Sequence, residues 1–319
     1  MKLRPSDLDE LKRQLVELRQ AGGRVAGVEL RSMDRVLDHQ PDDMTITVEA
    51  GITVGRLQER ATGAGQWLPI DPPHAERCSV GALIAGNASG SRRYGYGTIR
   101  EHLIGLGVVL ADGRLIRSGG RVVKNVAGYD LQKLFVGSRG SLGVIVEATF
   151  KLLPLPESER LVQARCVTLA EAGTLLERVV EARLAPVILD LHNLDDDTGP
   201  GRTPTLVLGF AGTREFVDHQ IDQARQLGVG SPIAGNPQER FWSDPAPARM
   251  LSVLPSRVVE ILGGMGEGTW LAHAGNGVIH YRGGETPPQP ALPWALLRRI
   301  KTAFDPTGLF PQLPGCEMA

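Results

Sequence analysis

Glycines crowd into one stretch of this chain, residues 119–151, and they constrain its fold more than any other feature. A glycine pair opens the stretch, and Gly137, Gly140 and Gly143 follow the segment KNVAGYDL. Glycines this close together mark backbone that approaches something closely or takes dihedral angles that other residues avoid. The alternating apolar run after Gly143 predicts a strand. We infer that this stretch lies against a large cofactor.

Composition narrows the class of protein. The 35 basic and 36 acidic residues leave a net charge of −1, so no overall field steers the chain to nucleic acid or to a membrane surface. Cys78, Cys166 and Cys316 are odd in number and far apart, which predicts neither a disulfide framework nor a metal site. No run of about 18 apolar residues predicts a transmembrane helix. We therefore expect a cytoplasmic protein without a metal centre.

A length of 319 residues predicts two compact units, and Pro154-Leu155-Pro156 marks the expected boundary. The first domain is expected over 1–156. It contains a half-buried strand, because Met44, Ile46, Val48 and Ala50 alternate with polar residues. Asp112-Gly113 predicts a hairpin in the same domain.

The second domain is expected over 157–319. Strands and helices alternate there in the order of a split βαβ, ferredoxin-like unit. The expected elements are strands at 161–167, 187–192, 205–210 and 229–233, and helices at 168–183 and 213–227. A hairpin at 269–281 and a terminal helix at 294–304 follow.

Two common nucleotide-binding motifs are missing from the sequence. No G-x-G-x-x-G lies between an expected strand and helix with an acidic residue about 20 positions further on, and no G-x-x-x-x-G-K-[ST] loop occurs. The glycine-rich stretches therefore argue against an NAD-type domain and against a nucleotide triphosphatase.

KNVAGYDL, GSRGSLGVI and the late FDPTGLF together resemble the FAD-linked oxidase family, whose fold is shared by vanillyl-alcohol oxidase and p-cresol methylhydroxylase. Within that family the chain is most similar to the FAD-binding subunits of bacterial glycolate oxidases. The resemblance implies an α+β protein. A PCMH-type (p-cresol methylhydroxylase-type) FAD-binding domain of two α+β subdomains is expected, with a ferredoxin-like α+β cap domain over the flavin ring.

The resemblance also implies which residues hold a non-covalent FAD. Small residues let backbone N–H groups reach phosphate oxygens, and two arginines match basic positions of the family. The alternative for each arginine is a solvated surface charge that does not contact the cofactor. The implied cofactor-binding residues are Pro72, Pro73, Ser79, Val80, Gly81, Ala82, Ala85, Gly86, Asn87, Ser89, Gly90, Arg93, Gly97, Arg100, Gly140, Gly143 and Val144.

Histidines and one polar cluster are the remaining candidates. Related oxidases use a histidine in a late hairpin to bind a hydroxy-acid carboxylate, and a histidine also serves as a base. Of His273 and His280, which flank a Gly-Asn-Gly turn, we take His280 as the catalytic candidate. The alternative for each is a local hydrogen bond. His74 lies beside the predicted cofactor site. Lys124, Asn125, Tyr129 and Asp130 could lie at the seam between flavin and a partner subunit, but we favour a structural role, in which Tyr129 and Asp130 satisfy buried loop backbone.

The sequence departs from the family pattern in two places. Family members place a strand and a glycine-rich diphosphate turn before the segment equivalent to GVELRSMDRVLDH, and here Gly22–Leu30 runs almost directly into that segment. The turn also carries the histidine for covalent flavin in some relatives, so that route is excluded. The second departure is Gly81-Ala82 in place of two glycines, which requires a negative φ at Ala82.

Two functions therefore stay open. One is the FAD-binding subunit of a glycolate oxidase-like, 2-hydroxy acid dehydrogenase complex, with a larger flavoprotein subunit and an iron–sulfur subunit as partners. These partners would also provide its contact with the inner membrane. The other is a flavin-free or weakly binding structural subunit of such a complex, which has lost its diphosphate turn.

Overall fold

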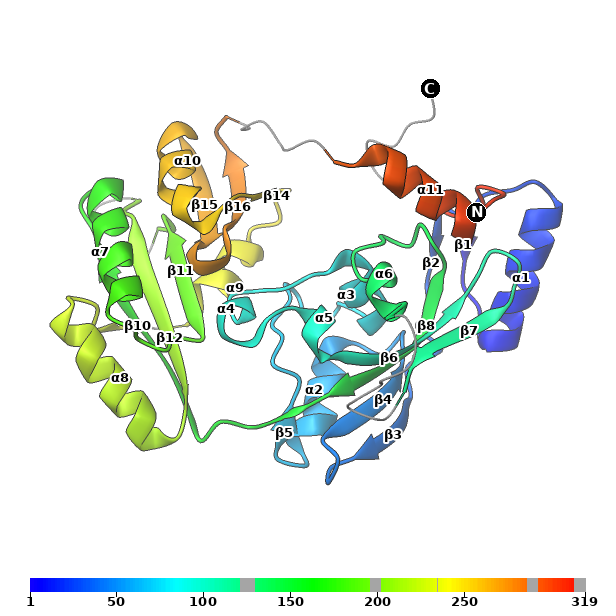
Figure 1. Ribbon diagram of the computed structural model, residues 1–319, viewed down its shortest axis with the longest axis horizontal. Helices are drawn as coiled ribbons and strands as arrows, with labels where there is room; N and C mark the ends of the chain where they lie inside the picture. Colours follow the sequence, from blue (N-terminus) through cyan, green and yellow to red (C-terminus); the bar gives the residue numbers. More distant parts are fainter. Residues whose placement is uncertain (121–129, 196–201, 234, 286–291, 313–319) are drawn as a thin grey trace. The chain divides into compact units, whose positions relative to one another are not determined.

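The chain forms two compact units, each with its own sheet (Figure 1). The computed structural model describes residues 1–120, 130–195, 202–233, 235–285 and 292–312, so Lys124, Asn125, Tyr129 and Cys316 lie outside the described residues. The first unit comprises Met1–Ser89, Thr98–Leu155 and Ala291–Ala319, and the second comprises Gly90–Gly97 and Pro156–Pro290.

The first unit is built on a five-stranded antiparallel sheet in the order β3-β4-β8-β6-β7. Its strands are β3 (Val36–Gln40), β4 (Thr45–Glu49), β8 (Val144–Lys151), β6 (Leu103–Val109) and β7 (Leu115–Gly119). The predicted Asp112-Gly113 hairpin joins β6 to β7, with Gly113 at a φ of 81°. Two further short strands, β5 (Gln66–Trp67) and β9 (Leu153–Pro154), pair antiparallel in a separate two-stranded sheet of the same unit.

Helices cover both faces of this sheet. On one face the main core gathers side chains from α2 (Val54–Thr62), α3 (Val80–Gly86), α5 (Ile99–His102) and α6 (Gln132–Phe135). On the other face, α1 (Leu8–Gln20) packs Leu11 and Leu15 against Val109, Val144 and Val146. Two short parallel strands, β1 (Lys2–Leu3) and β2 (Gly27–Val28), lie before and after α1.

Strand β4 is buried on both faces, whereas its alternating sequence predicts one exposed face. It is an inner strand of the sheet, and its polar side chains find partners there. The Thr47 hydroxyl shares a 3.0 Å hydrogen bond with Thr149 on β8, and Arg35 donates to the Glu49 carboxylate. Cross-strand polar pairing thus allows an alternating strand to be covered on both sides.

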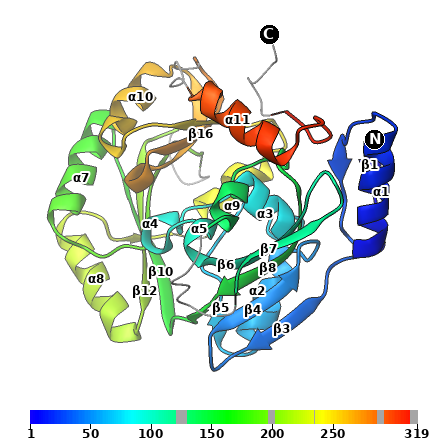
Figure 2. The same cartoon turned by 45° about the vertical axis from the view of Figure 1, so that its right-hand side comes forward.

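The second unit confirms the predicted ferredoxin-like cap. Its strands β10 (Ser158–Arg165), β11 (Ile188–His192), β12 (Thr205–Gly212) and β13 (Ser231–Pro232) lie in the spatial order β13-β10-β12-β11. Helices α7 (Leu169–Glu181) and α8 (Arg214–Gln226) connect them and lie side by side on one face (Figures 1 and 2).

Three more strands extend the cap sheet beyond β11, in the order β15-β16-β14. The predicted late hairpin is β15 (Gly268–His273) and β16 (Val278–Gly283), and its turn places Gly277 at a φ of 70°. β14 (Arg249–Ser252) forms the edge. α10 (Val258–Gly264) joins the α7 and α8 side of the core, and α9 (Pro237–Ser243) packs Phe241 against Leu271 on the other face.

The second unit also takes residues 90–97 from the predicted cofactor stretch. This segment includes α4 (Arg93–Tyr96). Arg92 forms a forked ion pair with Glu159 at 2.8–3.0 Å, and the buried Ser91 donates to Gln238. The Gly95 N–H donates to the Val187 carbonyl. These contacts attach the segment to the cap, so the stretch from 79 to 97 serves two units rather than one site.

The C-terminal helix α11 (Trp294–Phe304) belongs to the first unit, although the expected domain division placed it with the cap. Phe304 packs edge-on against Phe135 at 5.6 Å between ring centroids. Leu309 and Phe310, just after the helix, enter the core beside α1. These long-range contacts have no local signature in the sequence. For that reason the sequence predicts a second domain that continues from residue 157 to the end of the chain.

Candidate functional site

A groove of about 280 Å³ in the first unit gathers many of the residues that the sequence predicted to hold FAD. Seven of them line it: Ser79, Gly81, Ala82, Ala85, Gly140, Gly143 and Val144. Further wall residues, which the sequence did not single out as cofactor contacts, are Val25–Val28, Leu30, Ala50, Arg139, Ile145, Phe310 and Pro311. The volume is close to the lower end of the ~300–1,000 Å³ typical of ligand pockets.

Glycine occurs at the groove positions for two different structural reasons. Gly140 has a φ of 73° and open space where a Cβ would stand, so its backbone faces the groove without cover. Gly81 and Gly143 instead let secondary structure pack closely. A Cβ at Gly81 would lie 3.2 Å from the Ala50 carbonyl oxygen, and one at Gly143 would lie 2.7 Å from the Val108 side chain. Both kinds keep the groove lined by bare backbone.

Ala82 stands where the family has a second glycine, and the structure tolerates its Cβ. Ala82 lies in the first turn of α3, in ordinary helical backbone. The Ser79 hydroxyl caps this helix by accepting from the Ala82 N–H at 3.2 Å. The methyl group therefore adds an apolar wall to the groove without backbone strain.

Arg139 is the cationic side chain that the sequence reading missed. Its guanidinium side chain is exposed and its residue lines the groove. The backbone at Arg139 takes a left-handed φ of 52°, and its N–H donates to the Ala85 carbonyl at 2.8 Å. Next to it, the buried Ser138 hydroxyl oxygen has no hydrogen-bond partner within the described chain. A strained, exposed arginine among bare glycines is suited to an anionic ligand.

The other predicted cofactor residues lie away from the groove wall. Val80 is fully buried in the core, and Gly86 and Asn87 end α3. Pro72, Pro73 and Ser89 lie in loops, and Arg100 is exposed on α5. Gly90, Arg93 and Gly97 are part of the second unit. His74 is exposed in a loop at a φ of 54°.

The structure agrees with the absence of a diphosphate turn after α1. Only residues 21–26 separate α1 from β2, and residues 29–35, which contain no glycine, lead from β2 into β3. The groove wall on this side is made by Val25–Val28 together with Phe310 and Pro311. The Val25 N–H donates to the Leu309 carbonyl at 2.8 Å. A C-terminal segment thus lies directly beside the shortened N-terminal one.

These features fit part of a dinucleotide such as FAD. The groove offers uncovered backbone at Gly27 and Gly140, apolar walls at Ala82 and Val144, and a cation at Arg139. Bare backbone suits a diphosphate, and apolar walls suit a purine ring. The residues that would hold the cofactor come from α3, the loop before β8 and the Val25–Val28 strand.

The second unit carries a separate cluster of buried polar residues. The strand registers place Asp190, His192, His273 and His280 on one face of β11, β15 and β16. Every one of them is less than 9% exposed. Asp190 accepts a hydrogen bond from His273 Nδ1 at 2.9 Å, and the rings of His273 and His280 are 5.3 Å apart. Sequence reasoning singled out the two histidines of the hairpin but missed Asp190 and His192.

Burial keeps two of these histidines neutral. Burial, reinforced by the electrostatic influence of His273, Arg282 and Arg93, lowers the pKa of His280 to about 3. Burial chiefly, with Arg240, lowers the pKa of His192 to about 4. The His280 ring also packs edge-on against Trp242 at 5.1 Å. At neutral pH His280 is thus an uncharged hydrogen-bonding group beside two arginines.

The described residues offer neither a metal centre nor a membrane-spanning helix. They contain no group of three or more His, Cys, Asp or Glu side chains placed to hold a metal ion. Within the same part of the chain, none of the helices has the length and apolar character needed to cross a bilayer.

Comparison with known proteins, like the groove, indicates an FAD-binding protein. The FAD binding domain family matches residues 16–119. A glycolate oxidase subunit GlcE of Escherichia coli (strain K12) is 35% identical over 217 residues, covering 67% of this chain and 56% of that protein. A probable mitochondrial D-lactate dehydrogenase of Danio rerio is 35% identical over 213 residues, covering 62% of this chain and 42% of that protein.

A solved structure of alkyldihydroxyacetonephosphate synthase shares the fold, with a TM-score of 0.74 at 16% identity over 98% of this chain and 77% of that one. The chain spans between 42% and 56% of the length of the two curated relatives above. FAD is the cofactor of the matched domain, and the lining of the groove fits part of this cofactor. Residues 16–119 therefore match a PCMH-type FAD-binding domain, and the chain is similar to glycolate oxidase and D-lactate dehydrogenase proteins.

Proposed function

We propose that this chain is the FAD-binding subunit of a 2-hydroxy acid dehydrogenase complex of the glycolate and D-lactate class. The groove supports this most directly, because seven residues of the family motifs line it together from distant parts of the chain: Ser79, Gly81, Ala82, Ala85, Gly140, Gly143 and Val144. The names of the relatives, glycolate oxidase subunits and D-lactate dehydrogenases, supply the substrate class.

In such a complex, bound flavin supplies the acceptor for the hydride equivalent that leaves the hydroxy acid. This chain's residues bind and orient the cofactor through the groove. We assign the remaining redox centres to partners: a larger flavoprotein subunit and an iron–sulfur subunit, through which the complex reaches the inner membrane. An iron–sulfur cluster is held by cysteine thiolates, and Cys78 and Cys166 are single cysteines in different units.

Arginine 139 provides the sharpest test of FAD binding. We expect purified protein to bind FAD, and Arg139→Gln to weaken that binding by about tenfold, since a hydrogen bond to a charged group contributes about 1.5–3 kcal/mol. The melting temperature should not change, because the Arg139 side chain is exposed. Titration of FAD, followed by flavin fluorescence and visible absorbance, measures both affinities.

Arg100→Gln is the matched control for this experiment. Arg100 is also an exposed arginine of the first unit, and the sequence predicted it as a phosphate contact, but it does not line the groove. FAD affinity should be unchanged in this variant. If Arg100→Gln weakens binding and Arg139→Gln does not, the groove is not the diphosphate site.

The flavin-free alternative keeps one observation in its favour, the missing diphosphate turn. Under that reading the groove is a remnant of the fold, and the chain serves assembly of the complex. A colourless protein that takes up no added FAD, alone and together with its larger flavoprotein partner, would establish this second function and overturn the first.

We further propose that His280 contacts the hydroxy acid. It is neutral at physiological pH and lies beside the positive charges of Arg282 and Arg93, an environment that favours a carboxylate. Asp190 orients the neighbouring His273 through its Nδ1 atom. His280→Asn should lower turnover of glycolate or D-lactate with an artificial acceptor by at least about tenfold while flavin content stays the same.

The same variant has a second readout in its pH dependence. Above pH 6.5, a histidine whose pKa is lowered by folding is neutral in both the folded and the unfolded protein. Below pH 6.5, this histidine binds a proton in the unfolded protein but stays neutral in the folded protein. Stability is therefore lost as the pH falls from 6.5 toward 3 or 4, by about 2 kcal/mol for each such histidine at pH 5. His280→Asn should remove its share, which urea unfolding at pH 7 and pH 5 measures.

His192→Asn is the control, because His192 is equally buried and has a similarly lowered pKa. An asparagine oxygen can still accept the Leu194 N–H that His192 Nδ1 now accepts at 3.2 Å. This variant should reduce the acid sensitivity by a similar amount and leave turnover unchanged. Equal turnover in both variants and the native protein would remove His280 from the catalytic site.

A further inference from the structure

The one buried residue of the C-terminal helix α11 is a lysine, Lys301. Helices normally attach to a domain through an apolar stripe, and here only Ile300 and Phe304 provide partly buried apolar contacts. The Lys301 side chain is 7% exposed and forms an ion pair with Asp305, whose side chain is fully buried. A buried ion pair is a poor source of stability compared with apolar packing, so its geometry is the feature to explain.

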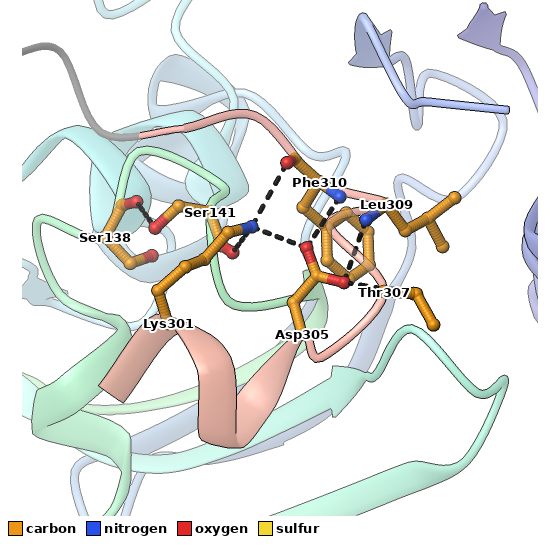
Figure 3. Close-up of polar contacts among 7 residues, drawn as sticks. All are labelled: Ser138, Ser141, Lys301, Asp305, Thr307, Leu309 and Phe310. Carbon is orange, nitrogen blue, oxygen red and sulfur yellow. Dashed lines mark hydrogen bonds and ion pairs between the residues drawn. The ribbon is translucent and has the colours of Figure 1, made fainter. Parts of the chain in front are cut away.

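Lys301 joins two walls of the FAD groove (Figure 3). Its ammonium group donates to the Ser141 carbonyl at 2.7 Å, in the loop between Gly140 and Gly143. It also donates to the Phe310 carbonyl at 3.1 Å, and Phe310 lines the groove from the C-terminal side. With Asp305 as the third acceptor, all three donors of the ammonium group are used.

Asp305 fixes the C-terminal wall from the other end. Its carboxylate accepts the Leu309 N–H at 2.9 Å and the Phe310 N–H at 2.8 Å, which turns the chain back sharply after α11. The Leu309 carbonyl then accepts from Val25, the first residue of the N-terminal wall. A continuous set of hydrogen bonds thus runs from the glycine loop through Lys301 and Asp305 to the Val25–Val28 strand.

We propose that Lys301 is a positioning residue for the cofactor groove, and that the Lys301–Asp305 pair holds Phe310 and Pro311 as a replacement wall on the side where the diphosphate turn is missing. This inference rests on the proposed FAD function. The pair sets the distance between the glycine loop and the C-terminal segment, because one ammonium group bonds to carbonyls of both. An apolar side chain of similar length fills the same space but fixes neither carbonyl.

Lys301→Met tests the proposal, since methionine keeps the length of the side chain and removes the charge. We expect FAD affinity to fall by at least about tenfold at a temperature where circular dichroism shows folded protein. Amide hydrogen exchange at Val25, Leu309 and Phe310 should become faster. If Lys301→Met does not fold, Asp305→Asn is the second variant, because it keeps a side-chain acceptor and weakens the ion pair.

Ile300→Ala is the matched control. Ile300 precedes Lys301 on the same helix and packs against the main core without lining the groove. It should lower the melting temperature and leave FAD affinity within twofold of the native value. Native-like affinity in both Lys301→Met and Asp305→Asn would overturn the positioning role alone, and native protein that binds no FAD would overturn it together with the proposed function.

Discussion

Replacing Gly81 with leucine should weaken FAD binding by at least about a hundredfold. Gly81 lines the groove, and a Cβ built there stands 3.2 Å from the Ala50 carbonyl oxygen and 3.3 Å from the Ala50 Cβ. Ala50 is also part of the groove wall. The remaining atoms of the leucine side chain therefore have to occupy the groove between Gly81 and Ala50. The reason for the loss is therefore steric exclusion of the cofactor rather than loss of a bond.

Overpacking at Gly81 should also lower the free energy of unfolding, by about 1–3 kcal/mol. FAD affinity has to be measured well below the unfolding transition, and urea unfolding without FAD gives the stability term separately. A thermal shift with and without FAD then shows directly whether the folded variant still binds.

Gly86→Leu is the control on the same helix. A Cβ at Gly86 meets no heavy atom within 4 Å, and Gly86 does not line the groove. Leucine also has a higher helix propensity than glycine, so this variant should be as stable as the native protein or slightly more so. Equal FAD affinity in Gly81→Leu and Gly86→Leu would place the cofactor somewhere other than this groove.

Local patterns predicted much of the fold. The cap follows the expected order of strands and helices, because each of its elements is long enough for its own periodicity and cap to show. The hairpin at Asp112-Gly113 and the left-handed glycines Gly137 and Gly140 follow from local backbone requirements. For strand β4 the alternation of residues was correct, but its exposure was not, because exposure depends on what packs over the sheet.

The candidate site was predicted only in part, since half of its walls come from distant segments. Val25–Val28 have no motif that marks them, and the FDPTGLF motif that ends at Phe310 does not show which segment it contacts; the two meet through the Leu309–Val25 hydrogen bond across the length of the chain. Asp190 likewise reaches His273 only through strand pairing. Arg139 lies inside a predicted glycine loop, where nothing in the sequence distinguishes it from a solvated surface charge.

The shortened N-terminal segment leads to the second large effect. Replacing Gly51 with alanine should lower the free energy of unfolding by about 3–5 kcal/mol. A Cβ at Gly51 would fall on the carbonyl oxygen of Leu30 and lie 2.5 Å from that of Met33. Both contacts are with backbone, which cannot move aside as a flexible side chain can.

Residues 30–33 pass this close because the Gly51 N–H donates to the Met33 carbonyl at 2.9 Å, which ties the segment after β2 to the end of β4. Without a diphosphate turn between them, β2 and β3 are joined by this short crossing alone. An alanine at position 51 therefore strains one of the connections that hold the Val25–Val28 wall against the sheet, and FAD affinity should fall along with stability.

Gly27→Ala is the control that separates the loss of stability from the effect on the N-terminal wall of the groove. Gly27 lies in the Val25–Val28 wall, and a Cβ there meets no heavy atom within 4 Å, so stability should stay within about 0.5 kcal/mol of the native value. Urea unfolding of the two variants side by side measures the difference. If Gly51→Ala is as stable as Gly27→Ala, the segment at 30–33 does not cross Gly51 closely. The N-terminal wall of the groove would then have to be held by the C-terminal segment alone, through Leu309 and the Lys301–Asp305 pair.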